Sequence, residues 1–401
     1  MITKQQKELI KATVPILKEH GVALTSHFYK RMFSHNPELK NVFNMGNQQS
    51  GKQQMSLAMA VLAYAENIED PSVLINAVTK IGHKHKSLDI RPEHYAIVGN
   101  HLLSSIKEVL GDGASAELLE AWGVAYNQLA DILIGLEDGL YKEAVSKEGG
   151  WTGWRPFNVK KKVKESDEIT SFYLYPSDGG KVADFTPGQY LSIRLYLPEL
   201  NLFQPRQYSI SSAPNGEYYR ISVKKEPAKE ICPEGMVSNE LHNKVKEGDI
   251  LEVSSPAGDF VLDIQKDTPL VFISGGVGQT PFISMLEHIA KNNSKKDITW
   301  IHGCRNSSVH AFKELTDKYT EEIELNTKYF YENLDQAGKN CNHGLINISE
   351  LKEEIVKDGA NYYICGPAPF IEKVHGDLTS IGVNKEAIHY EEFGPANLFL
   401  N

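Results

Sequence analysis

The sequence predicts three domains in a row: an all-α domain, a small antiparallel β-barrel, and an α/β domain with a parallel sheet. Three observations carry this multidomain fold class. Apolar residues recur at helical spacing up to Lys147, almost without strand-like alternation. Short alternating runs separated by turn-forming clusters follow Gly149-Gly150. From Thr268 the pattern becomes strand, glycine turn and helix.

The first predicted domain, residues 1–147, is helical because its apolar residues recur every three or four positions. One such face contains Leu74, Val78 and Ile81 and ends at His85, which predicts that the His85 ring points into the domain. Helix boundaries are expected at three prolines and one glycine cluster. These are Asn36-Pro37, Asp70-Pro71, Arg91-Pro92 and residues 111–113.

The second predicted domain, residues 151–263, consists of closely spaced strands. Clusters such as Asp178-Gly179-Gly180 and Thr186-Pro187-Gly188 separate them and are typical of turns. Close strand spacing with frequent turns favours a small antiparallel barrel. The expected strands are residues 158–163, 169–175, 190–197 and 219–224.

The third predicted domain, residues 267–401, alternates strands with helices. Such a pattern is typical of a parallel sheet, which binds ligands at the carboxyl ends of its strands. The expected strands are residues 269–274, 298–302 and 362–365. The expected helices are residues 281–291, 311–319 and 350–357.

Composition excludes several classes of function. The formal net charge of −10 argues against nucleic acid and anionic membranes as partners. No stretch approaches the roughly 20 apolar residues that span a bilayer, and the first residues do not resemble a secretory signal. The four cysteines are widely spaced without a CxxC pair, which argues against disulfides and zinc. We expect a cytoplasmic protein without an obligate protein partner.

Taken alone, His85 is more readily interpreted as a core histidine. The helical domain, however, contains three longer segments that carry more information: HFYKRMFSHNPELKNVFNM (residues 27–45), GKQQMSLAMA (51–60) and KHKSL (84–88). With these segments the domain resembles the globin domain of the flavohaemoglobins. The resemblance implies that His85 is the proximal ligand of a haem b iron and that Phe43 packs against the porphyrin. It also implies a distal pocket for diatomic ligands, formed by Tyr29, Gln53 and Leu57.

Further residues are expected around the proximal histidine. By the same resemblance, Tyr95 and Glu137 form hydrogen bonds near His85, where a carboxylate raises the basicity of the imidazole. The alternative is that Glu137 is a solvated helix residue, as the following Asp138 suggests. Gly82 is expected to leave room for a bulky planar group.

Three short segments of the barrel resemble the ferredoxin-reductase type of FAD-binding domain. They are GQY (residues 188–190), RQYS (206–209) and GMVSN (235–239). In this interpretation Arg206 neutralises the flavin pyrophosphate, Tyr208 lies against the isoalloxazine ring and Ser209 hydrogen-bonds near flavin N5. The alternative is a surface ion pair and barrel packing. The other expected FAD residues are Tyr190, Gln207, Gly235, Val237 and Ser238.

Three further segments predict an NAD(P)H site. ISGGVGQTP (residues 273–281) departs from the GxGxxG pattern because Pro281 replaces the last glycine, but its glycines still permit close approach of a phosphate. CGP (365–367) and YEEFGP (390–395) support it, although Cys365 is also interpretable as a small buried residue. Arg305 weakly favours NADPH, and NADH stays open. The resemblance also implies that Phe393 covers the flavin ring and that Glu391 helps to place the nicotinamide or relays protons. The expected cofactor-binding residues of these segments are Gly276, Gly278, Gln279, Thr280, Pro281, Cys365, Gly366, Pro367, Glu391, Phe393, Gly394 and Pro395.

The resemblance covers essentially the whole chain, with the three domains in the family's order. It implies a nitric oxide dioxygenase, which converts NO and O2 to nitrate with electrons that pass from NAD(P)H through FAD to haem and so protects against nitrosative stress. Two alternatives stay open at this point. One is a haem-based sensor of O2 or NO, and the other is an NAD(P)H oxidase or flavin reductase.

Overall fold

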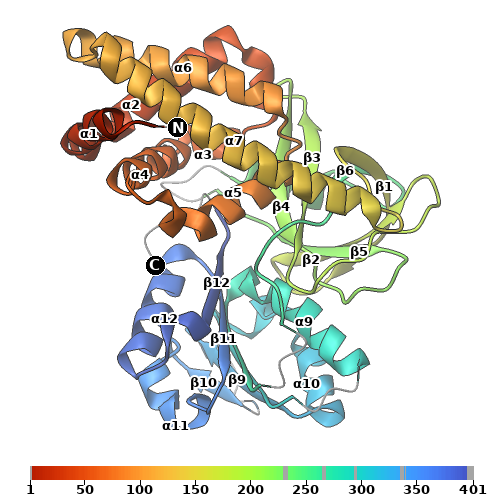
Figure 1. Ribbon diagram of the computed structural model, residues 1–401. Coiled ribbons are helices and arrows are strands. Elements are labelled where there is room, and N and C mark those ends of the chain that lie inside the picture. Colours follow the sequence, from red (N-terminus) through yellow and green to blue (C-terminus); the bar gives the residue numbers. More distant parts are fainter. Residues whose placement is uncertain are drawn as a thin grey trace.

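The chain folds into the three kinds of domain that the sequence predicts (Figure 1). The computed structural model describes residues 2–228, 234–263, 268–292, 296–334, 338 and 340–394. A helical domain comes first, followed by a six-stranded antiparallel sheet and a six-stranded parallel sheet. Within these residues no helix is both long and apolar enough to cross a membrane.

The helical domain begins and ends its helices at the residues that favour such boundaries. Prolines occupy the first turns of η1, η2 and α6, where a missing backbone N–H costs nothing. Its core packs Phe28, Met32 and Trp122 between α2, α4, α6 and α7. The helices are α1 (Lys4–Ala12), α2 (Val14–His35), η1 (Pro37–Asn41), α3 (Met45–Gln49), α4 (Lys52–Glu66), η2 (Pro71–Leu74), α5 (Ile75–Ser87), α6 (Pro92–Leu110), η3 (Gly111–Gly113) and α7 (Ala116–Ser146).

Gly82 has a different role from the expected one. A Cβ atom at this position would lie only 2.6 Å from Cδ2 of Leu136 on α7. The interpretation that Gly82 leaves room for a planar group is therefore wrong. The missing side chain instead lets α5 and α7 pack closely together.

The antiparallel sheet has the strand order β4-β3-β6-β1-β2-β5, and a bridge between Ile210 and Ile221 joins its two edges. Phe157, Phe172 and Leu191 are fully buried inside it. The sequence analysis did not predict β4, because Pro205 interrupts it; proline is tolerated there at a sheet edge. The elements are β1 (Trp154–Lys164), β2 (Ile169–Pro176), β3 (Tyr190–Leu197), β4 (Leu202–Ser209), β5 (Tyr219–Lys224), α8 (Met236–Asn243) and β6 (Ile250–Ser254).

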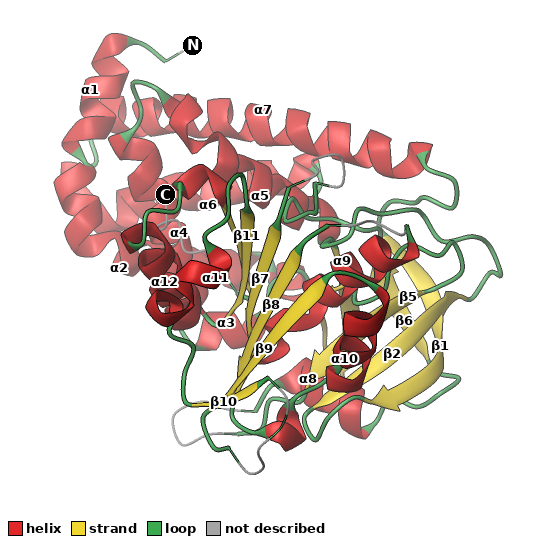
Figure 2. Ribbon diagram, turned by 90° about the horizontal axis from the view of Figure 1, so that it is seen from below, coloured by secondary structure: helices red, strands yellow, loops and turns green. Residues whose placement is uncertain are grey.

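The parallel sheet has the order β10-β9-β8-β7-β11-β12, with α9 and α10 on one face and α11 and α12 on the other (Figure 2). The strand order reverses between β7 and β11, the kind of position where such sheets bind ligands. The elements are β7 (Leu270–Gly275), η4 (Gly276–Gln279), α9 (Thr280–Lys291), β8 (Ile298–Cys304), η5 (Ser307–Val309), α10 (Lys313–Glu322), β9 (Leu325–Tyr331), β10 (Cys341–His343), η6 (Ile348–Leu351), α11 (Lys352–Ile355), β11 (Asn361–Gly366), α12 (Ala368–Ser380), η7 (Lys385–Ala387) and β12 (Ile388–Glu392).

Two buried histidines stack beside β8. The rings of His302 and His310 lie 4.5 Å apart. The Nδ1 atom of His302 is 2.9 Å from the Ser274 hydroxyl, and that of His310 is 2.8 Å from the Tyr331 hydroxyl. Burial lowers the pKa of His310 to about 3 and holds the pKa of His302 well below its usual value. Both imidazoles are therefore neutral in the folded protein.

We predict that this pair makes the fold sensitive to acid. An unfolded histidine has a pKa of about 6.5, so unfolding below that pH takes up protons that the folded pair does not bind. The stability from neutral burial is complete above about pH 6.5 and declines as pH falls. His310→Gln should lower proton uptake on urea unfolding at pH 5 by roughly one proton. Replacement of the exposed His20 by Gln provides the control, and equal uptake by wild type and His310→Gln would contradict the prediction.

Candidate functional site

His85 lies near the end of α5, held by residues of two other helices. Its Nδ1 atom is 2.8 Å from Oε1 of Glu137 on α7 and 2.9 Å from the Tyr95 hydroxyl on α6. Tyr95 also donates a hydrogen bond to the same Glu137 oxygen. Glu137 is only 2% exposed, so the alternative of a solvated helix residue is wrong.

This arrangement fits an axial haem ligand. A proton on Nδ1 that is donated to the carboxylate leaves the lone pair on Nε2, and Nε2 has no protein partner among the described residues. Burial, followed by the interaction with Glu137, raises the pKa of the Tyr95 hydroxyl, which therefore stays protonated as a donor. The carboxylate makes the imidazole a stronger base and a stronger iron ligand.

The three residues expected in the distal pocket, and Phe43, which is expected to pack against the porphyrin, come from neighbouring elements. Tyr29 is on α2, Gln53 and Leu57 are on α4, and Phe43 follows η1. The Tyr29 side chain is 4% exposed, and its ring centroid lies 5.7 Å from that of Phe43. Burial raises the pKa of the Tyr29 hydroxyl, whereas hydrogen bonds with Gln53 and Gln48 lower it by a smaller amount. Tyr29 therefore remains a neutral hydrogen-bond donor at physiological pH.

Gln48 on α3 is a residue that the sequence analysis missed. It is buried, and its Oε1 atom accepts a hydrogen bond of 3.0 Å from Gln54. One glutamine between two motif segments carries no signal in the sequence. Its position beside Tyr29 depends on how α3 packs against α4.

Arg206 on β4 is a half-buried cation without a carboxylate partner among the described residues. Its guanidinium donates to the carbonyl oxygen of Pro205 at 2.6 Å, and burial lowers its pKa to about 10. A buried charge is costly unless an opposite charge compensates it. The Cβ position of Gly46 lies 3.7 Å from a terminal nitrogen of Arg206 and 3.8 Å from Met236, the first residue of α8. Arg206, α3 and the start of α8 thus lie close together.

The barrel brings the GQY and RQYS motifs together by direct strand pairing. Tyr190 on β3 pairs with Ser209 on β4, and Ser192 pairs with Gln207. Tyr208 lies between them and opposite Leu191.

The GMVSN segment has a more structural character than the sequence analysis expected. Val237 is buried in the barrel core, and the Ser238 hydroxyl donates to the carbonyl oxygen of Gly235 at 3.0 Å. Backbone amides at the start of α8 are therefore the groups that remain for a phosphate.

The glycine turn after β7 touches the CGP segment after β11. A Cβ atom at Gly278 would lie 2.1 Å from the carbonyl oxygen of Cys365, so only glycine allows this contact. Gln279 is fully buried, and neither its Nε2 nor its Oε1 has a partner within the described residues. An amide of this kind needs a polar ligand, which a nucleotide supplies. Thr280 and Pro281 form the first turn of α9, whereas Gly366 and Pro367 connect β11 to α12.

The sulfur of Cys365 has no reactive character. The residue is fully buried, and this burial raises the pKa of its thiol well above the usual value. This agrees with the alternative interpretation of Cys365 as a small buried residue.

The C-terminal motif extends the same region. Glu391 on β12 pairs in register with Cys365 on β11. Burial and the nearby Asp259 raise the pKa of Glu391 to about 7, while Lys80 and Lys84 of α5 oppose the rise. Phe393 and Gly394 follow β12, with Phe393 45% exposed, and Pro395 lies outside the described residues.

Arg305, which weakly favours NADPH in the sequence, already has a partner. Its guanidinium forms an ion pair with Glu168 at the start of the barrel's β2. A 2′-phosphate would have to compete with this carboxylate for the same cation.

A buried ion pair that no pattern in the sequence indicates joins the barrel of residues 151–263 to the α/β domain. Arg220 on β5 lies 2.8 Å from Oε1 of Glu287 on α9, and both side chains are nearly buried. The other oxygen of Glu287 accepts from the Ala213 amide at 2.9 Å. One turn earlier, the Ser284 hydroxyl donates to the carbonyl oxygen of Ser212 at 2.8 Å. These contacts fix α9 against the segment that continues β4.

Comparison with family models divides the chain in the same way. Residues 26–133 match the globin family, residues 156–262 the oxidoreductase FAD-binding domain, and residues 272–376 the oxidoreductase NAD-binding domain. These matches show an oxidoreductase with haem, FAD and a nicotinamide nucleotide as its cofactors.

Similar proteins span the full length of the chain. A protein named flavohemoprotein from Bordetella pertussis is 51% identical over 98% of this chain and 99% of its own. The flavohemoprotein of Bacillus cereus is 49% identical over 99% of both chains. The crystal structure of a flavohemoglobin from Malassezia yamatoensis with bound FAD and heme has the same fold, with a TM-score of 0.85 and 24% identity over 98% of this chain and 100% of that one.

We predict that Glu137→Gln changes the iron more than the fold. Glutamine still accepts from His85 but lacks the negative charge, so the imidazole becomes a weaker base. Haem should stay bound, while the haem reduction potential rises and the iron–histidine stretching frequency in resonance Raman spectra falls. Glu120→Gln, an exposed site on α7, should leave both values unchanged. Identical spectra and potentials for Glu137→Gln would show that the carboxylate only fills space.

We also predict that Arg206→Met weakens FAD binding without loss of haem. The loss of one charge-assisted contact to phosphate should raise the Kd for FAD by about 10- to 100-fold. The ratio of FAD to haem in the purified protein measures this effect. Arg194→Met removes a cation from β3 that pairs with Glu252 and is the matched control. Full FAD content in Arg206→Met would disprove the assignment.

Proposed function

The chain belongs to the flavohaemoprotein family, and on that premise we propose that it is a nitric oxide dioxygenase. It would convert NO and O2 to nitrate at a haem that NAD(P)H reduces through FAD, in the cytoplasm and as protection against nitrosative stress. One arrangement carries the proposal. In the same globin domain, His85 is hydrogen-bonded to the Glu137 carboxylate, and Tyr29 is buried with its hydroxyl protonated. In addition, a Vibrio cholerae protein whose FAD/NAD-binding part is 38% identical over 60% of this chain is named a nitric oxide dioxygenase.

The globin residues would each contribute one physical effect. When bound, the nicotinamide supplies a hydride, FAD divides the electron pair, and haem iron receives single electrons and binds a diatomic ligand. Tyr29 and Gln53 would donate hydrogen bonds toward the negative charge that dioxygen gains on reduction. Leu57 and Phe43 would keep the pocket small and apolar. Glu137 and Tyr95 would hold the tautomer and orientation of His85.

The reductase residues would bind and orient the two other cofactors. Arg206 and the amides that follow Gly235 at the start of α8 would hold the FAD pyrophosphate, while Tyr190, Gln207, Tyr208 and Ser209 would line the flavin ring and Phe393 would cover it. The glycine turn, the CGP segment and Glu391 would place the nicotinamide nucleotide. We propose domain boundaries at 1–147, 151–263 and 267–401, in keeping with the end of α7 at Ser146 and the starts of β1 at Trp154 and β7 at Leu270.

The decisive experiment is a product analysis of the purified protein. NADH or NADPH is added without oxygen, then O2 and NO are supplied in turn while visible spectra and nitrate are recorded. Nitrate equal to the NO consumed, with one NAD(P)H used for two NO, is the expected result. Superoxide or peroxide in place of nitrate would indicate an oxidase, and ligand binding without product would indicate a sensor.

We predict that Tyr29→Phe weakens the hold on oxygen and slows nitrate formation. One buried hydrogen bond to a charged acceptor contributes about 1.5–3 kcal/mol, so O2 dissociation should accelerate at least about tenfold. Flash photolysis measures this rate. Tyr64→Phe is the matched control, because Tyr64 is also buried in this core but donates to the Ala125 carbonyl oxygen. An unchanged O2 dissociation rate in Tyr29→Phe would show that this hydroxyl is structural.

A further inference from the structure

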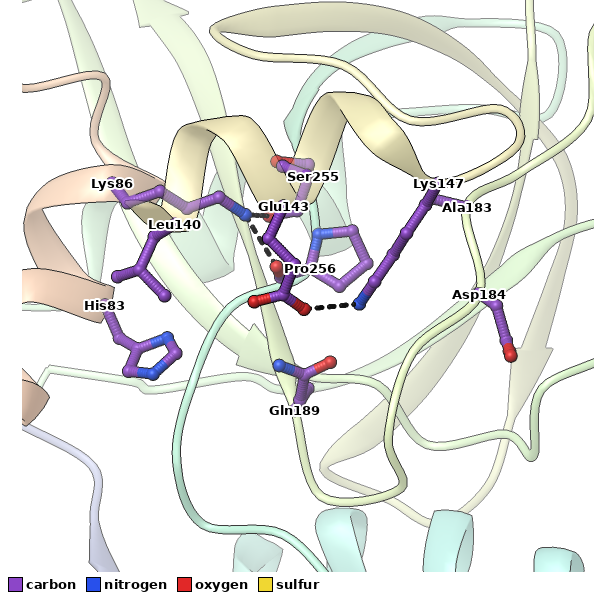
Figure 3. A pocket seen from close by; sticks show the side chains of 11 residues that line it. His83, Lys86, Leu140, Glu143, Lys147, Ala183, Asp184, Gln189, Ser255 and Pro256 are labelled. Carbon is purple, nitrogen blue, oxygen red and sulfur yellow. Dashed lines mark hydrogen bonds and ion pairs between the residues drawn. The ribbon is translucent and has the colours of Figure 1, made fainter. Parts of the chain in front are cut away.

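The Lys86 amine is buried at the boundary between the globin domain and the antiparallel barrel of residues 151–263. It directly follows His85 on α5 and is only 5% exposed. Its Nζ atom donates to the carbonyl oxygens of Pro256 at 2.7 Å and Ser255 at 3.2 Å (Figure 3). Both acceptors lie in the turn that follows β6. One side chain of the globin domain thus binds two backbone groups of the barrel.

The next residues of α5 are attached to the barrel as well. The Ser192 hydroxyl on β3 donates to the Ser87 hydroxyl at 2.9 Å, and the Gln207 amide on β4 donates to Ser192 at 3.1 Å. On the other side of His85, the Gly258 amide donates to Nδ1 of His83 at 3.2 Å. The short segment that carries the axial histidine is therefore connected to the RQYS strand and to the turn after β6.

Packing alone does not hold this boundary together. Lys86 lines a small cavity that opens to solvent, with His83, Glu143, Lys147 and Gln189 among the other lining residues (Figure 3). Side chains that face this opening lack packing partners on one side. Directional hydrogen bonds therefore contribute to the position of α5 relative to the barrel, and the bond from Lys86 to Pro256 is shorter than those that Ser87 and His83 accept from the barrel.

We propose that Lys86 is a positioning residue that holds the histidine-bearing end of α5 against the flavin barrel and thereby sets the rate of electron transfer from flavin to haem. The reason is geometric. The rate of electron transfer falls steeply with distance, and the His85 backbone moves with Lys86. The proposal rests on the flavin-to-haem electron path of the proposed function but not on any chemistry of nitric oxide.

The test compares two lysines that line the same cavity. Lys86→Met keeps the aliphatic length but loses both hydrogen bonds to the barrel. Lys147→Met is the matched control, because the ion pair of Lys147 is to Glu143 on its own helix, at 3.0 Å. Neither variant touches the nucleotide turn, so flavin reduction by NADH should keep its wild-type rate in both.

Anaerobic stopped-flow mixing of the holoprotein with NADH, without NO, separates flavin reduction from haem reduction. In Lys86→Met we expect haem reduction to slow by about tenfold, as a small displacement of a reacting pair can cause. Lys147→Met should match wild type. Unchanged haem reduction in Lys86→Met overturns the proposal, whereas failure to form nitrate would affect only the proposed function.

Hydrogen exchange provides a readout that does not depend on electron transfer. The amides of Ala257 and Gly258 bond to Tyr190 and His83 in the folded protein. They should exchange faster in Lys86→Met than in Lys147→Met, and equal protection overturns the proposal. If Lys86→Met fails to retain haem, Lys86→Gln replaces it, because its shorter side chain retains a donor but reaches less far. The rate of haem reduction and the exchange of the two amides then test the proposal in Lys86→Gln, with the same expected and contrary results.

Discussion

The position of α5 is the constraint on which the rest of the structure depends. This one helix holds His85 against Glu137 inside the globin domain, binds the barrel through Lys86 and Ser87, and places Lys80 over the Tyr390 ring of β12 at 4.5 Å. Figure 1 shows it where the three domains meet. An electron path from nucleotide to iron needs the three cofactors close to one point. A single helix that contacts every domain meets that need.

Ionisable side chains are buried where the three domains meet, and this burial shifts their pKa values. Burial lowers the pKa of Lys86 to about 7 and also lowers the pKa of Lys84, where Glu391 and Glu392 oppose the effect. Burial raises the pKa of Glu391 to about 7 from the other side. For Lys84 and Glu391, the energetic cost of desolvation therefore exceeds the attraction between their opposite charges. The amine of Lys86 remains in place because backbone carbonyl oxygens accept its hydrogen bonds.

The sequence predicts those features that depend on local patterns. The glycine turn at 275–278 and the strands at 190–197 and 219–224 follow from turn chemistry and alternation, and the structure confirms these elements. Strand β4 was missed because Pro205 breaks its pattern and only its place at the sheet edge permits it. The position of Gln48 beside Tyr29 results from tertiary packing. So does the ion pair between Arg220 and Glu287, which lie 67 positions apart in the sequence. No local pattern in a single sequence indicates such contacts.

The two boundaries between domains differ in a way that suits the two kinds of transfer. The nucleotide domain is fixed to the barrel by a buried ion pair and by Ser284, contacts that leave little freedom. The contacts named above between the globin domain and the barrel are hydrogen bonds, and Met45 to Gln204 at 2.9 Å and Phe203 to Asn41 at 2.8 Å are two further ones. Hydride transfer needs the reacting atoms almost in contact, about 3–3.5 Å apart, whereas an electron crosses a longer gap. The buried ion pair therefore lies at the boundary where the chemistry tolerates the least displacement.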